Sequence, residues 1–128
     1  MQRQGRRDTK PEMALRRALW ARGLRYRVDR APIPGTRRRA DIVFGPAKVA
    51  VYVDGCFWHS CPEHATLPKN NREWWRAKLA ANVRRDRDTD RQLAEAGWRV
   101  VRVWEHEETA VAVERVVREL GESGEWLL

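Results

Sequence analysis

Two short apolar runs separated by a Gly-Pro pair constrain the fold of this chain more than any other feature. RRADIVF covers residues 38–44 and KVAVYVD covers residues 48–54. Apolar runs of strand length joined by a Gly-Pro turn are typical of a β-hairpin. We therefore predict two neighbouring antiparallel strands, the second of which ends at Asp54.

A long polar helix and another apolar strand are expected after the hairpin. Residues 71–96 place Leu79 and Val83 on one helical face, and Gly97 ends that pattern. The next run, WRVVRVWEH at residues 98–106, is apolar enough to lie centrally in a sheet. A helix between two strands acts as a crossover, so we expect this strand to lie parallel to its predecessor.

Three further elements complete the predicted order. Residues 10–22 have helical periodicity after Thr9, which has capping-box spacing to Glu12. The alternating stretch 24–29 predicts a strand, and the Val-rich stretch 109–120 predicts a closing helix. The predicted order α-β-β-β-α-β-α corresponds to an α/β fold with a mixed sheet flanked by helices.

The charge balance indicates a polyanionic partner. Lysine and arginine number 26 against 18 acidic residues, a net charge of +8, and basic side chains bind phosphates by displacing counterions. An arginine-rich surface that only improves solubility is the alternative. With 128 residues, we expect one domain at 9–128 after a mobile basic arm at 1–8. No signal peptide or membrane-spanning run is evident, so we predict a cytoplasmic protein.

The loop after the hairpin concentrates potential zinc ligands. Cys56, Cys61 and His64 form a C-x4-C-x2-H pattern, and a closed tetrahedral site needs a fourth ligand. His106 ends the last predicted strand and would lie near this loop if that strand is parallel to the one ending at Asp54. These four residues predict a structural zinc site, with two buried thiols and two surface imidazoles as the alternative.

Three other residues suggest hydrolytic chemistry. Asp41 opens the first hairpin strand and Asp54 closes the second, so their carboxylates can meet at one end of the pair. Carboxylates in such a position can hold Mg2+ and bridge to phosphate, although each Asp also suits a turn. His59 lies between the cysteines and is a candidate general base or a solvated loop histidine.

Several motifs together resemble one family. VYVDGCFWHSCPEH, then LPKNNREWW, then NVRRDRDTDRQLAEAGWRVVRVWEHE are similar to the very short patch repair (Vsr) endonucleases, from about Thr9 to Glu107. The resemblance implies a fold like the PD-(D/E)xK nucleases. It also implies an enzyme that nicks DNA 5′ of the thymine in a T:G mismatch.

The resemblance assigns roles to single positions. Asp41 and the backbone carbonyl of Val53 would hold catalytic Mg2+, His59 would be the catalytic histidine, and Glu12 would be an assisting acid. We expect His59 to take a proton from a water that Mg2+ activates. The family's structural zinc ligands fall on the set proposed above, Cys56, Cys61, His64 and His106.

The resemblance also gives the aromatic residues a role in DNA binding. Family members wedge aromatic rings into the base stack beside the mismatch, and Phe57, Trp58 and Trp75 match them, with Trp74 as an alternative to Trp75. Unstacking costs least where pairing is already weak, so wedging would also detect a mismatch. Three polar residues of the LPKNNREWW stretch are further predicted DNA contacts: Lys69, Asn71 and Arg72.

The sequence departs from the family pattern in the sheet motif. Asp41 follows Ala40 rather than proline, and the lysine of PD-(D/E)xK nucleases is missing, as is usual in this family. Asp54 stands where some members carry histidine, so Asp54 is also a candidate catalytic residue and second metal ligand.

Three hypotheses therefore remain open at this point. The first is a Mg2+-dependent mismatch nickase, the second a less selective restriction- or defence-type nuclease, and the third a zinc-stapled DNA-binding module without catalysis. A monomer suits a single-strand nick, and mismatch-repair helper proteins are conceivable partners on double-stranded DNA.

Overall fold

The computed structural model describes residues 10–33, 35, 38–55 and 70–123, which form three helices and four strands. The elements are α1 (Lys10–Ala21), β1 (Arg27–Arg30), β2 (Ala40–Phe44), β3 (Val49–Asp54), α2 (Arg72–Glu95), β4 (Arg99–Trp104) and α3 (Thr109–Ser123). This order confirms the prediction, and most boundaries agree within three residues. The predicted arm at 1–8 and the Thr9 cap lie outside the described residues.

The four strands form one mixed sheet in the order β1-β2-β3-β4. The hairpin is antiparallel, with Phe44 opposite Val49, and β3 pairs with β4 in parallel, from Val49 beside Arg99 to Asp54 beside Trp104. The crossover through α2 therefore brings the carboxyl ends of β3 and β4 together, as predicted.

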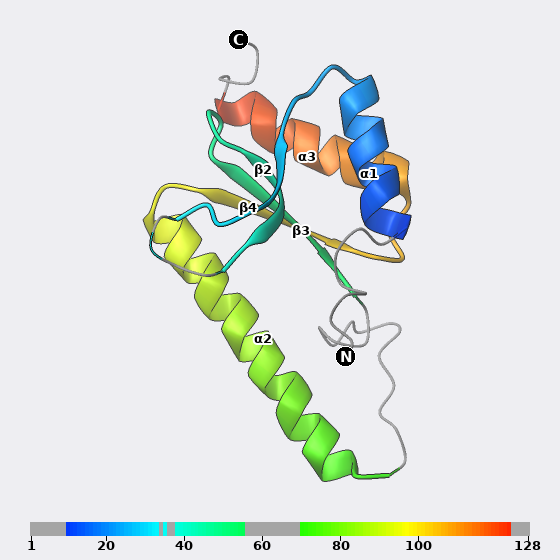
Figure 1. Cartoon of the computed structure of the whole chain (residues 1–128), viewed down its shortest axis with the longest axis vertical. Helices are drawn as coiled ribbons and strands as arrows, with labels where there is room; N and C mark the ends of the chain where they lie inside the picture. The colour runs from blue at the N-terminus through cyan, green and yellow to red at the C-terminus, as the bar shows by residue number, and fades with distance from the viewer. Residues whose placement is uncertain (1–9, 34, 36–37, 56–69, 124–128) are drawn as a thin grey trace.

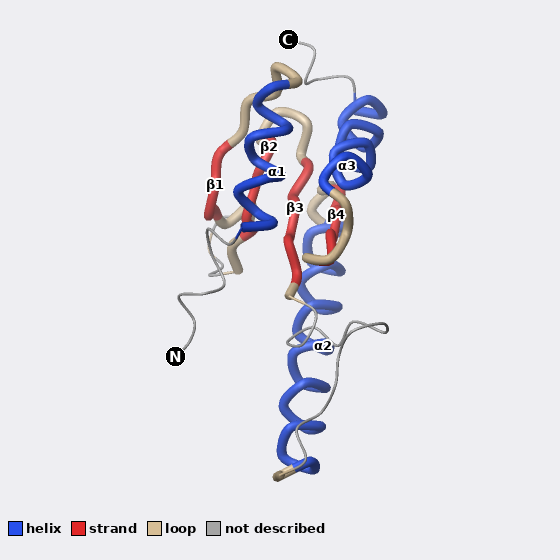
Figure 2. Tube along the Cα trace, turned by 90° about the vertical axis from the view of Figure 1, so that its right-hand side faces the viewer, coloured by secondary structure: helices blue, strands red, loops and turns tan. Residues whose placement is uncertain are grey.

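Alternating side chains of the strands build a core on each face of the sheet. On one face, strand residues such as Val51 and Val103 pack against Leu15 of α1 and Val116 of α3. On the other face, a smaller cluster includes Ala50, Tyr52 and Leu93 of α2. The sheet is thus a middle layer between the α1/α3 pair and α2 (Figure 2).

The strand β4 is at an edge of the sheet, so the expectation that it lies centrally was wrong for the residues that the structure describes. Its apolar character has another cause. Val101 and Val103 are buried in the α1/α3 core, and α2 packs on β4 from the other side. Helices thus cover both faces of this edge strand.

The helix α2 is much longer than the sheet that it covers. Its 24 residues extend about 36 Å at 1.5 Å per residue. Leu93 near its carboxyl end packs on the sheet, whereas the first turns extend past the carboxyl end of β3 (Figure 1). No helix within the described ranges is long and apolar enough to cross a membrane.

Gly23 and Gly97 end α1 and α2 in the left-handed region, with φ of 87° and 88°. Around Gly97, the Trp98 N–H donates to the Leu93 carbonyl at 2.9 Å, which closes the last turn of α2. This turn sets the direction in which the chain enters β4.

Replacing Gly97 by alanine should therefore destabilise the protein by about 1–2 kcal/mol, because an L side chain is strained at this φ. Gly121, inside α3 with open space around it, is the matched control. Gly121→Ala should be neutral or stabilise by up to about 1 kcal/mol. Urea unfolding of both variants measures these changes, and an unaltered midpoint for Gly97→Ala would contradict the assignment.

Candidate active site

The hairpin strands part at the end where Asp41 and Asp54 lie. Pairing between β2 and β3 runs from Phe44–Val49 to Ile42–Val51 and stops there among the described residues. The pairing of β1 with β2 continues to Ala40, and that of β3 with β4 continues to Asp54. The gap between the central strands is thus a local feature, and Asp41 stands at its edge.

The carboxylate of Asp41 bridges this gap. Its Oδ2 accepts a hydrogen bond from the Val53 N–H at 2.7 Å, in place of the next rung of the ladder. Burial, together with the charges of Glu12 and Asp54, raises the pKa of Asp41 to about 7, although the Val53 hydrogen bond and the charge of Arg16 act to lower it. Burial and two acidic neighbours therefore disfavour the ionised form of Asp41 more than the Val53 hydrogen bond and the charge of Arg16 favour it.

Glu12 approaches the same site from the first turn of α1. Its side chain is only 1% exposed and forms an ion pair with Arg16, one turn later. An acid in the first turn of a helix is also stabilised by the helix dipole. In this arrangement Glu12 acts on Asp41 through its charge, while its own carboxylate is bound by Arg16.

Asp54 is held by an arginine that the sequence analysis did not single out. Both carboxylate oxygens of Asp54 accept hydrogen bonds from Nη1 of Arg102 in β4, at 3.2 and 3.1 Å. The same guanidinium binds Asp90 of α2 through Nε and Nη2. Burial opposes the charge of Arg102, but the hydrogen bond that it donates to Asp90 and the charges of Asp54, Asp90 and Asp86 raise its pKa above the ordinary arginine value.

A signal for this cluster exists in the sequence. Arg102 is a charged residue between two buried valines, and Asp86 and Asp90 are four residues apart, on one face of α2. The carboxylate of Asp86 lies 4.0 Å from Arg102 Nη1. The partner itself could not be named before the strand and the helix were placed together.

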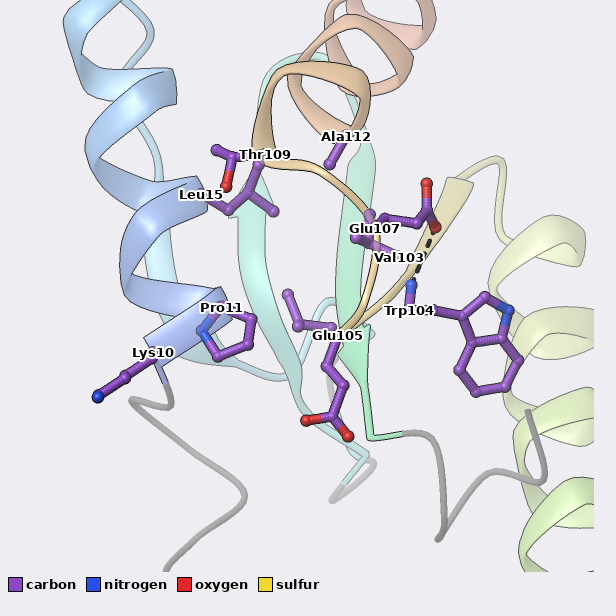
Figure 3. Close-up of a pocket in the computed structure, with 10 residues that line it drawn as sticks. Lys10, Pro11, Leu15, Val103, Trp104, Glu105, Glu107, Thr109 and Ala112 are labelled. Carbon is purple, nitrogen blue, oxygen red and sulfur yellow. Dashed lines mark hydrogen bonds between the residues drawn. The ribbon is translucent and has the colours of Figure 1, made fainter. Parts of the chain in front are cut away.

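A pocket of about 210 Å3 opens beside this site, on the α1/α3 side of the sheet. Figure 3 shows Pro11 and Leu15 of α1 on one side, and Glu105 and Glu107 of the turn after β4 on the other. Val53 lines the pocket as well and connects it to the site of Asp41. Glu107 is engaged by the Trp104 N–H at 3.0 Å and by Arg115.

The predicted zinc site is described only in part. His106 lies in the exposed turn after β4, and the Glu105 N–H donates to the Asp54 carbonyl at 2.9 Å. The turn of His106 and the start of the cysteine loop are thus adjacent, as the zinc hypothesis requires. The other three ligands, Cys56, Cys61 and His64, lie outside the described residues.

The predicted DNA-contacting residues of α2 lie at its projecting end. Asn71 and Arg72 are exposed, and Trp74 is 55% exposed with its ring in edge contact with Trp75, at 4.8 Å between centroids. Trp75 is only partly exposed, so Trp74 offers the larger free surface. Four other predicted site residues lie outside the described residues: Phe57, Trp58, His59 and Lys69.

The structure limits how a cation could bind. Among the described residues, no three His, Cys, Asp or Glu side chains form a group that could hold a metal ion. A site built from the side chains of Asp41, Glu12 and Asp54 together is therefore not present in this arrangement. Mg2+, however, needs only one or two protein carboxylates, because it keeps several waters and binds substrate phosphate.

Comparison with known proteins identifies the family. Residues 1–64 match the family described as DNA mismatch endonuclease Vsr. The Type II nicking enzyme V.NaeI of Lentzea aerocolonigenes is 52% identical over 119 residues, 91% of this chain and 72% of that protein. The DNA mismatch endonuclease Vsr of Escherichia coli (strain K12) is 40% identical over 102 residues, 77% of this chain and 62% of that protein.

A third relative is the Type II nicking enzyme V.NmeDIP of Neisseria meningitidis serogroup C. It is 43% identical over 109 residues, which are 84% of this chain and 72% of that protein. The chain therefore belongs to the Vsr family, as its motifs predicted, and it is an endonuclease that acts on DNA.

The raised pKa of Asp41 predicts a pH-dependent stability. Asp41 is protonated in both states below about pH 4, but above about pH 7 the native state must hold it ionised at a cost. Asp41→Asn should therefore be more stable than the unaltered protein at pH 8, by at most about 4 kcal/mol at ~1.36 kcal/mol per pKa unit. This gain should vanish towards pH 4.

Urea unfolding between pH 4 and 8, without added divalent cations, measures the difference. Asp88→Asn is the control, because hydrogen bonds from Arg91 and Arg38 lower the pKa of Asp88. That variant should instead lose stability at neutral pH and regain it on acidification. A gain for Asp41→Asn that does not vary with pH would contradict the electrostatic account.

Proposed function

We propose that this endonuclease nicks one strand of double-stranded DNA 5′ of the thymine in a T:G mismatch and requires Mg2+. The observation that carries the proposal is the Asp41 carboxylate at the parting of β2 and β3, in a chain of the Vsr family. A DNA-binding module without catalysis would have no need of a carboxylate held there at a raised pKa.

The donor set of the site fits Mg2+. Asp41 would hold the ion with its carboxylate, and Val53 would contribute its backbone carbonyl. A cation would offset the burial and the neighbouring charges of Glu12 and Asp54 that raise the pKa of Asp41. Bound Mg2+ would supply Lewis acidity and would neutralise charge that develops on the scissile phosphate.

The proton transfer is assigned to His59. This residue follows the end of β3 by five positions, so a short segment connects it to the strand that Asp41 contacts. We propose that His59 removes the proton of the attacking water as a general base. Glu12, held by Arg16, would keep the field around Asp41 negative and so favour the cation.

We propose that aromatic side chains detect the mismatch by inserting into the base stack. Phe57 and Trp58 would insert from the loop, together with one tryptophan from the start of α2. The exposure of Trp74 favours this ring over Trp75 for direct insertion. The exposed Asn71 and Arg72 would contact phosphate, as would Lys69, which precedes them in the sequence. Monomeric action and any helper protein remain predictions.

A second candidate function is supported by the comparisons. Several relatives are named Type II nicking enzymes, among them V.NaeI. This chain could therefore nick DNA with less dependence on a mismatch, using the same catalytic residues. The two candidates share their chemistry and differ in the DNA that they select.

The deciding experiment is a nicking assay on three labelled duplexes that differ in one base pair, T:G, T:A or C:G, with Mg2+. We expect one cut 5′ of the mismatched thymine, at least about tenfold faster than any cut in the matched duplexes, since unstacking costs least at a mismatch. Asp41→Ala should abolish it. Equal cutting of all three duplexes would establish the second candidate, and binding without cutting would refute both.

The zinc proposal has its own test. We propose that Cys56, Cys61, His64 and His106 bind one structural Zn2+, which would hold the loop beside the catalytic site. The purified protein should contain one zinc per chain by elemental analysis, and Cys61→Ser should lose most of it and unfold at lower temperature. Zinc-free protein with unchanged melting and nicking would contradict this proposal.

A further inference from the structure

Arg102 joins three elements through one guanidinium group. Its Nη1 donates to both oxygens of Asp54 at the end of β3, at 3.1 and 3.2 Å. Its Nε donates to both oxygens of Asp90, at 3.0 and 3.1 Å, and its Nη2 donates to Asp90 Oδ1 at 2.7 Å. Nη2 also lies 3.5 Å from the backbone oxygen of Asp86. All three nitrogens are thus committed to acidic residues or the α2 backbone.

The plane of this guanidinium is fixed as well. Its central carbon lies 4.3 Å from the centre of the Tyr52 ring, a cation–π contact. The side chain of Arg102 is 22% exposed and that of Asp54 is 8% exposed, so solvent competes little for their hydrogen bonds. Stacking and paired hydrogen bonds together hold the arginine in one orientation.

Asp54 is the carboxylate that this arrangement controls. It is the last residue of β3 and follows Val53 directly, and its charge acts on Asp41. Both aspartates lie at the same end of the β2–β3 pair, so Asp54 is the second carboxylate that could join Asp41 in binding a cation. Both of its oxygens face Arg102 instead.

We propose that Arg102 is a positioning residue that holds Asp54 out of the coordination of the catalytic cation, so that Asp41 remains the single carboxylate of that site. The inference rests on the proposed Mg2+-dependent reaction and resolves which of the two aspartates binds the ion. Asp86 and Asp90 serve to orient Arg102, which also ties the end of β3 to α2.

Removing Arg102 should strengthen the binding of a divalent cation. The loss of one positive charge and the release of Asp54 both make the surroundings of Asp41 more negative, so a divalent cation should bind more tightly. The reaction should nonetheless slow, because the ion would be shared between two carboxylates and shifted from the phosphate. A residue with only a structural role would weaken binding and activity together.

Calorimetric titration of the DNA-free protein with Mn2+ tests the predicted gain in cation affinity independently of nicking activity. Arg102→Gln should bind Mn2+ at least about threefold more tightly than the unaltered protein and nick at least about tenfold more slowly. The double variant Arg102→Gln with Asp54→Asn should return to within about twofold of the original affinity, because no carboxylate is released.

Asp54→Asn alone keeps the test valid if Arg102→Gln does not fold. Its amide oxygen can still accept from Arg102, and its Mn2+ affinity should stay within about threefold of the original. Arg99→Gln is the matched control, since Arg99 lies at the other end of β4 and binds the Glu119 carbonyl. It should alter neither Mn2+ affinity nor nicking.

Two results would overturn the inference. A loss of Mn2+ affinity of about tenfold or more in Asp54→Asn would make Asp54 a ligand. An unchanged or weaker affinity in folded Arg102→Gln would leave Arg102 a structural residue. If Asp41→Asn binds Mn2+ as well as the unaltered protein, the proposed site at Asp41 is wrong, and the inference about Arg102 fails with it. If Asp41→Asn loses Mn2+ affinity but folded Arg102→Gln does not gain it, only the inference about Arg102 fails.

Discussion

The hydrogen bond from the Val53 N–H to Asp41 is the interaction on which the candidate site depends. It replaces a rung of the β2–β3 ladder, so a buried carboxylate satisfies the backbone where the strands part. Despite this hydrogen bond, burial and the charges of Glu12 and Asp54 raise the pKa of Asp41. In the proposed mechanism, a bound cation would offset the cost of ionising this carboxylate.

The sheet determines what surrounds this carboxylate. Because β3 and β4 are parallel and end side by side, the loop that carries His59 and the turn that carries His106 start from neighbouring points. The crossover helix α2 reaches back past this end of the sheet and presents Trp74 there, while its later turns supply Asp86 and Asp90 to Arg102 (Figure 1). The β3–α2–β4 crossover thus connects the proposed DNA reading, the proposed anchoring of the loop and the proposed catalysis.

Local patterns were sufficient to predict the elements and the pairing of the hairpin. The position of Asp41 and Asp54 at the same end of the hairpin also followed from the sequence, because it depends only on antiparallel pairing. The edge position of β4 and the contacts of Arg102 did not follow, because both depend on how α2 lies over the sheet. The sequence allowed two roles for Asp54, metal ligand or structural carboxylate, and its hydrogen bond from Arg102 favours the structural role.

Diffraction from crystals soaked in Mn2+ would test the central claim most directly, because the anomalous signal locates the ion independently of activity. The account expects one ion within about 2.3 Å of an Asp41 carboxylate oxygen, with Asp54 still bound to Arg102. An ion held by Asp54, Asp86 or Asp90, with none at Asp41, would contradict the account.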